Sequence, residues 1–310
     1  MTTKIKPLLL LTSFVFTSVG FAQTPPASDI YVGELTRDDK GLRVVNLERL
    51  THTDSYTNQP YFFDDFTLYY TEQVGQQTDI FRYDFQSKET SNLTQSTDSE
   101  YSATPMPNGD GFSVVKVDQE GKQELWQFSF AGDKIKHLAP SIEPVGYHLW
   151  TRDDKVFLFV LGEPNRLLLI DPSDTDGTAS EIDNNIGASL YAMPNTRGYT
   201  YTTSRSGNDD TLILRWYSAL SNERQVLTKL PKGAKYFTWT PSAELLTTDK
   251  GALVAMPFLV QGKRIESTVY SKVLIEGEAC QRSVSRIAVS PYNEKIALVC
   301  EAAPQHKEGL

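Results

Sequence analysis

One short strand-like segment recurs along this chain at nearly constant spacing. Each copy follows a tight turn and is rich in aromatic, β-branched and other large apolar residues. The copies begin at Leu68, Phe112, Val156, Tyr199, Leu245 and Ile296, so successive copies are 44, 44, 43, 46 and 51 residues apart. A period of roughly 40–50 residues is typical of the four-stranded blade of a β-propeller. The spacing therefore predicts a ring of repeated blades.

The turns before these copies share a chemistry. Residues 107–111 read PNGDG and residues 194–198 read PNTRG. Pro presets the first turn angle, and Asn, Asp and Gly tolerate the tight geometry that follows. A large apolar residue precedes most of the turns, and we expect these residues to pack between neighbouring blades: Phe62, Met106, Trp150, Met193 and Trp239.

The two ends of the chain predict how the ring closes. The last repeat begins with residues 285–289 and continues with residues 296–299, but its third strand would start near the end of the chain. Residues 29–35 have the pattern of that third strand, and residues 42–51 have the pattern of a fourth. We therefore expect the two ends to complete one blade, which removes every free sheet edge.

The fold class follows from these repeats. No apolar stripe of period 3.6 persists after the first residues, and 15 Tyr and 15 Phe accompany many Thr, Val and Leu. We predict an all-β, six-bladed propeller of four-stranded antiparallel blades, forming a single domain over residues 23–310. The expected blades are 56–99, 100–141, 142–185, 186–232, 233–281, and 283–302 together with 29–51.

The N-terminus has the pattern of a secretory signal peptide over residues 1–22. Lys4 and Lys6 precede an apolar run from Leu8 to Phe21, with small residues before a cleavage site after Ala22. The run is short for a membrane span. We therefore expect an exported protein, periplasmic or secreted, that does not span the membrane.

Charge and cysteine content limit the partners and the compartment. Cleavage removes two Lys and no acidic residue, so the formal net charge changes from −9 to −11. An acidic surface repels phosphate backbones, so we expect no nucleic-acid partner. A high net charge also helps to keep an exported protein monomeric, so we expect a monomer. Cys280 and Cys300 flank two strands expected to form a hairpin. An oxidising compartment permits a disulfide between them, and two buried thiols are the alternative.

The repeats also resemble a known family. The recurrent turn, the third strand typified by Asp79-Ile80-Phe81 and the blade ends Asn92-Leu93-Thr94 and Arg49-Leu50-Thr51 are similar to the TolB-type, WD40-like propeller repeat of exported bacterial proteins. The resemblance covers nearly all of the mature chain and implies a propeller scaffold. TolB itself has an extra N-terminal domain, for which we expect no room in this chain, so we do not expect its particular interaction to carry over.

Candidate catalytic and metal-binding residues are few. The possible bases are His52, His137, His148 and His306, and none lies in a recognisable Ser-His-acid context. There is no G-x-S-x-G elbow and no H-x-H or H-E-x-x-H motif. The acidic pairs 64–65, 153–154 and 209–210 lie in turns or a hairpin loop. The sequence predicts no catalytic residue, no cofactor and no metal site, although loop oxygens could hold Ca²⁺.

The opening residues of the first strand in each blade are the candidate binding residues. These strands line the axial channel of a propeller, and Tyr combines a large contact area with a polar hydroxyl. The alternative is that the tyrosines wedge between blades with their hydroxyls in water. The candidates at the channel mouth are Tyr56, Asn58, Gln59, Tyr101, Tyr147, His148, Ser189, Tyr191 and Tyr236.

The functional prediction is a non-enzymatic, TolB-like binding module for a protein or ligand, with an envelope protein or peptide as partner. Two other functions stay open. One is a metal-dependent lactonase or hydrolase that uses the same channel. The other is a purely structural scaffold in an envelope complex.

Overall fold

The computed structural model describes residues 26–174, 178–204, 210–260, 263–264, 269–281, 283–292 and 295–301. The predicted signal peptide, its cleavage site after Ala22 and His306 lie outside these ranges, as do Asp209 and most of the C-terminal tail. Every element in the described ranges is a strand. No helix in this part of the chain has the length and apolar character to cross a membrane.

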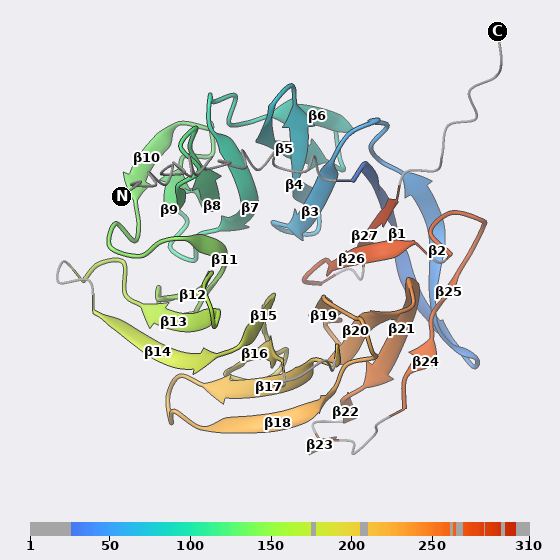
Figure 1. Cartoon of the computed structure of the whole chain (residues 1–310). Helices are drawn as coiled ribbons and strands as arrows, with labels where there is room; N and C mark the ends of the chain where they lie inside the picture. Colours follow the sequence, from blue (N-terminus) through green and yellow to red (C-terminus); the bar gives the residue numbers. More distant parts are fainter. Residues whose placement is uncertain are drawn as a thin grey trace, which may run out of the picture.

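Six sheets stand around a central axis, and Figure 1 looks down that axis. The chain passes from one sheet to the next in sequence order, and within each sheet the strands run from the axis outwards. We call the strands nearest the axis the inner strands: β3, β7, β11, β15, β19 and β26. The predicted all-β, six-bladed propeller is confirmed.

The first three blades are regular four-stranded antiparallel sheets. Blade 1 contains β3 (Thr57–Phe62), β4 (Thr67–Val74), β5 (Gln77–Asp84) and β6 (Glu89–Asn92). Blade 2 contains β7 (Ser99–Pro105), β8 (Phe112–Val117), β9 (Gln123–Phe128) and β10 (Lys134–His137). Blade 3 contains β11 (Val145–Trp150), β12 (Val156–Val160), β13 (Arg166–Ile170) and β14 (Ala179–Asn184).

The next two blades differ at their outer edge. Blade 4 contains β15 (Ile186–Ala192), β16 (Gly198–Thr203), β17 (Ile213–Ser218) and β18 (Arg224–Lys229). Blade 5 contains β19 (Phe237–Trp239), β20 (Glu244–Asp249), β21 (Ala252–Pro257) and the two-residue β24 (Ser271–Lys272). A separate hairpin of β22 (Leu259–Val260) and β23 (Lys263–Arg264) precedes β24.

The closing blade joins both ends of the chain. Its strands are β26 (Val284–Val289), β27 (Lys295–Glu301), β1 (Ser28–Asp38), β2 (Gly41–Arg49) and β25 (Leu274–Ile275), in that order from the axis. β1 pairs antiparallel with β27 from Ser28 opposite Glu301 to Glu34 opposite Lys295. β25 falls within the range expected for blade 5, but it pairs in parallel with β2 and extends the closing blade to five strands.

The apolar cores lie between neighbouring blades. Phe62 packs with Ala297 and Val299 of the closing blade, and Met106 packs with Val145 and Trp150 of blade 3. Met193 likewise packs with Phe237 and Trp239. The large residues before the turns therefore bridge adjacent blades, as their position in the repeat predicts.

One covalent link and one polar link reinforce the closing blade. Cys280, which precedes β26, forms a disulfide with Cys300 of β27. Asp29 of β1 is fully buried; it accepts hydrogen bonds from Arg49 Nη2 at 2.6 Å and from Thr51 Oγ1 and the Thr53 amide, both at 3.2 Å. One carboxylate thus ties β1 to the segment that leads into blade 1.

We expect Asp29→Ala to lower the free energy of unfolding by about 3 kcal/mol, because it leaves the Arg49 guanidinium and the Thr53 amide without their acceptor. Chemical denaturation followed by tryptophan fluorescence measures the change. The matched control is Glu34→Ala, an exposed carboxylate on the same strand, for which we expect a change within about 0.5 kcal/mol. Equal losses in both variants would contradict this role for Asp29.

Candidate binding site at the propeller axis

A cavity of about 270 Å³ lies on the axis, and all six inner strands contribute to its lining. The lining begins at a layer of side chains that includes Gln59, Tyr147, Tyr236 and Arg286, which we call the Arg286 layer. From this layer the lining continues along the strands to Pro194 and to the turn that begins at Pro291. The cavity therefore follows the second half of the inner strands.

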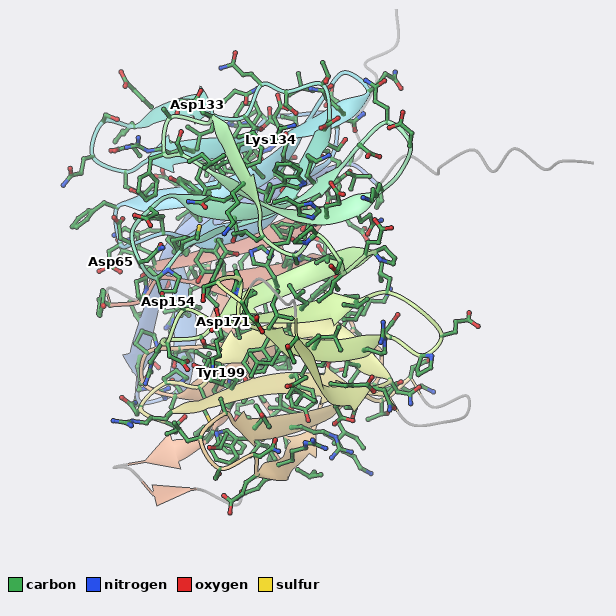
Figure 2. All side chains as sticks on the ribbon, turned by 90° about the vertical axis from the view of Figure 1, so that its left-hand side faces the viewer. Asp65, Asp133, Lys134, Asp154, Asp171 and Tyr199 are labelled. Atoms are coloured by element: carbon green, nitrogen blue, oxygen red, sulfur yellow. A yellow bond between two sulfur atoms is a disulfide. The ribbon has the colours of Figure 1, made fainter. Side chains whose placement is uncertain are left out.

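The tight turns after the inner strands mark one flat side of the ring. Figure 2 shows Asp65, in the turn between β3 and β4, and Asp154, in the turn between β11 and β12, toward the same side. Pro194 and Pro291 lie in the equivalent turns of blade 4 and the closing blade. The cavity consequently extends from the Arg286 layer toward this side, which we call the turn face.

Arg286, on β26 of the closing blade, reaches across the axis into a cluster of tyrosines. Its Nη2 donates a hydrogen bond to the Tyr147 hydroxyl at 2.9 Å. Its guanidinium carbon lies 4.0 Å from the centre of the Tyr236 ring and 5.3 Å from that of Tyr147. The two tyrosine hydroxyls are 3.5 Å apart. Arg286 thus combines one charge-assisted hydrogen bond with two cation–π contacts.

Arg286 is the one permanently charged side chain among the described residues that line this cavity. Within the described part of the chain it forms no ion pair with Asp or Glu; the groups that act most strongly on it are Tyr147, Tyr236 and Tyr56. The guanidinium stays protonated because arginine has a pKa above about 12. The result is a half-buried positive charge with aromatic neighbours and, among the described residues, no acidic counter-ion.

This charge changes the acidity of the nearby hydroxyls. Burial alone would raise the pKa of Tyr236, but the nearby Arg286 charge and the neighbouring Tyr147 hydroxyl outweigh burial and lower that pKa. Farther along the cavity, burial raises the pKa of Tyr61 to about 12. The cavity therefore favours negative charge beside Arg286 and disfavours it elsewhere.

Irregular backbone shapes the Arg286 layer. Gln59 of β3 and Ser102 of β7 both have positive φ, 56° in each case, at register shifts in their strands. Non-glycine residues in this conformation are strained, and such residues cluster at functional sites. The Ser102 hydroxyl donates to Gln59 Oε1 at 2.7 Å, which links blades 1 and 2 across the bulges.

Six of the nine residues predicted from sequence line the cavity: Gln59, Tyr147, His148, Ser189, Tyr191 and Tyr236. Tyr56, Asn58 and Tyr101 do not, because they precede the Arg286 layer on their strands. Tyr56 still belongs to the cluster, since its hydroxyl accepts a hydrogen bond from Gln59 Nε2 at 3.3 Å. The cavity lies along the second half of the inner strands, beyond the strand openings at which the repeat pattern predicts the site.

His148 is oriented into the contact between blades 2 and 3. Its Nε2 lies 2.6 Å from the Ser113 hydroxyl, which also accepts a hydrogen bond from Trp150 Nε1. Burial lowers the pKa of His148 to about 3, so the ring is neutral near pH 7. Ser113 is fully buried and His148 Nδ1 has no partner among the described residues. This pair lacks the exposed nucleophile and the orienting acid of a catalytic triad.

The acidic pair 64–65 has a structural role at its turn. Asp64 accepts a hydrogen bond from the Phe66 amide, and Asp65 accepts one from the Tyr292 amide of the closing blade. Among the described residues, no three His, Cys, Asp or Glu side chains are grouped as metal ligands would be.

Arg286 is the site residue that sequence reasoning missed. The repeat pattern places residues 285–289 on the first strand of the last blade and therefore at the axis, but the ligand types expected there, Tyr and small polar residues, do not include arginine. The available signal was a lone arginine in an inner strand, at the repeat position occupied by Tyr147 and Tyr236.

We expect Arg286→Met to keep or raise the free energy of unfolding, by up to about 2 kcal/mol. Removal of a half-buried charge that has no acidic partner among the described residues relieves more than the lost cation–π contacts cost. Thermal and chemical denaturation measure the difference. The control Ile287→Ala, a buried neighbour on β26, should lose about 2–4 kcal/mol. If Arg286→Met lowered the free energy of unfolding by a comparable amount, Arg286 would be a structural residue.

Glu100, beside Tyr101 on β7, gives the protein a pH-dependent stability. Its side chain is buried, its Oε2 has no partner among the described residues, and burial raises its pKa from 4.5 to about 7. A carboxyl that holds its proton more tightly in the folded state makes the protein lose stability as pH rises from about 4.5 to about 7.

We therefore expect Glu100→Gln to be more stable than wild type above about pH 7, by at most about 3 kcal/mol, and to match it near pH 4. The free energies of unfolding of Glu100→Gln and of wild type, measured across this pH range, test the expectation. Glu89→Gln, at an exposed position on β6, should follow the wild-type curve throughout. A Glu100→Gln difference that does not change with pH would refute the assignment.

Comparisons with known proteins agree on the fold. No protein-family model matches the sequence, and no curated protein matches it. A protein assigned as TolB from Agrobacterium tumefaciens has a TM-score of 0.62 at 12% identity, over 90% of this chain and 99% of that one. A chain of the nidogen–laminin complex has a TM-score of 0.58 at 11% identity, over 83% and 96%. A gluconolactonase from Xanthomonas campestris has a TM-score of 0.57 at 10% identity, over 90% and 99%.

At these identities the similarity concerns the fold alone, which does not determine function. The resemblance to TolB-type propellers seen in the repeat is confirmed at that level: this chain has the fold of a TolB-type six-bladed β-propeller.

Proposed function

We propose that this chain is an exported, periplasmic binding module whose axial cavity receives part of a protein or peptide partner. The observation that carries the proposal is the cavity itself. Among the described residues it combines aromatic rings, neutral hydroxyls and a single half-buried cation. Such a lining offers shape, apolar area and one strong polar anchor, which are the elements of recognition.

The compartment follows from two features that point the same way. The first residues have the charge and apolar pattern of a signal peptide. The disulfide between Cys280 and Cys300 is stable in an oxidising environment such as the periplasm. Both features therefore support export.

The fold similarity to a gluconolactonase favours one alternative, a metal-dependent lactonase or hydrolase. Such an enzyme needs carboxylates or imidazoles that converge on the reacting group. The cavity lining described here contains no Asp or Glu, and its one histidine is neutral and oriented toward Ser113. Binding without catalysis is the function that these side chains support best.

A cavity-filling variant tests the proposal. Ala192 lines the cavity and is exposed, so Ala192→Trp should fill the cavity without disturbing the cores. We expect the immobilised wild-type protein to retain a component of envelope extract at least tenfold better than Ala192→Trp does. The matched control is Leu220→Trp, in the exposed β17–β18 turn of the same blade, which should behave as wild type.

The other outcomes separate the alternatives. Equal retention by all three proteins would place the partner on an outer face and favour a structural scaffold. Retention, or lactone hydrolysis, that disappears after treatment with a chelator would favour the metal-dependent enzyme.

A further inference from the structure

We propose that the group recognised in the axial cavity is a single carboxylate bound by Arg286 and the Tyr147 and Tyr236 hydroxyls. The carboxylate is the C-terminus of a peptide or that of a small organic acid. This inference rests on the proposed function, since it names the chemistry that the cavity selects.

The first argument is the unbalanced charge. Burial of a guanidinium is costly unless an anion or several acceptors accompany it. In the described part of the chain, Arg286 has one hydrogen-bond acceptor, the Tyr147 oxygen. The cation–π contacts compensate part of the cost. An arriving anion would supply the missing acceptors, so binding and charge compensation would occur together.

The second argument is the donor geometry. Guanidinium is planar and pairs with a carboxylate through two parallel N–H···O bonds. Because the Tyr147 oxygen accepts from Arg286 Nη2, its own proton is available to the neighbouring Tyr236 oxygen, 3.5 Å away, or to a ligand. A carboxylate beside Arg286 would therefore receive N–H and O–H donors from two directions.

The third argument concerns the number of charges. The rest of the lining is neutral and includes Phe62, Leu149 and Val289, so a second anionic group in the cavity would find no counter-charge. With a volume of about 270 Å³, the cavity admits one terminal group and a short apolar segment rather than a phosphorylated chain.

Paired probes test the proposal: N-acetyl-Gly-Ala-Phe with a free and with an amidated C-terminus, and 3-phenylpropionate with 3-phenylpropionamide. Calorimetric titration measures their affinities. We expect each free acid to bind wild type at least tenfold more tightly than its amide. Arg286→Met should remove this preference, whereas Arg224→Met, at an exposed position on β18, should keep it.

The two acids distinguish the source of the carboxylate. Tighter binding of the peptide identifies a C-terminus, and tighter binding of 3-phenylpropionate identifies a free organic acid. A second readout is the ultraviolet titration of tyrosinate: a bound carboxylate offsets the Arg286 charge, so the lowest tyrosine titration should shift to higher pH. A purely structural arginine would give no such response to added ligand.

Four results would overturn the proposal: no binding of either acid, equal affinity of acid and amide, an unchanged preference in Arg286→Met, or tighter binding of inorganic phosphate or sulfate. Its failure is separable from that of the proposed function. If partner capture depends on Ala192 but not on Arg286, the cavity is still the binding site and only the carboxylate assignment falls.

Discussion

The pairing of β1 with β27 is the contact on which the rest of this structure depends. It joins the two ends of the described chain in one sheet and removes the edge at which a ring of blades would open. The same sheet holds β26 at the axis, and β26 carries Arg286. Closure of the fold and assembly of the candidate site are therefore one event, because the charged residue comes from the blade that both ends complete.

At the axial site, some contacts stabilise the fold, whereas others fit a role in recognition at a cost in stability. Apolar clusters between blades hold the ring together, and the buried His148–Ser113–Trp150 contacts reinforce it without any charge. Arg286 differs from these contacts, since it places a charge with no acidic partner in the described part of the chain among tyrosines. Natural proteins retain such costs mainly at functional sites. The strained backbone at Gln59 and Ser102 lies in the same layer and fits this view.

The repeat period and the turn residues predicted the propeller and its closure, because each blade is built from local hairpins whose signals lie close together in sequence. Phe62, Met106 and Trp239 could be assigned to the cores for the same reason. The cavity was harder to predict, because bulges in β3, β7 and β15 change which side chains face the axis. The role of Arg286 depends on Tyr147 and Tyr236, which are far from it in sequence and meet it only in the closed ring.

The most direct test of the account is an NMR measurement on protein with labelled arginine and tyrosine. The closed ring predicts nuclear Overhauser contacts from the Arg286 side chain to the rings of both Tyr147 and Tyr236, with slow exchange of its guanidinium protons. An Arg286 side chain with freely exchanging protons and no contact to either ring would contradict the shared axial site and the closure that creates it.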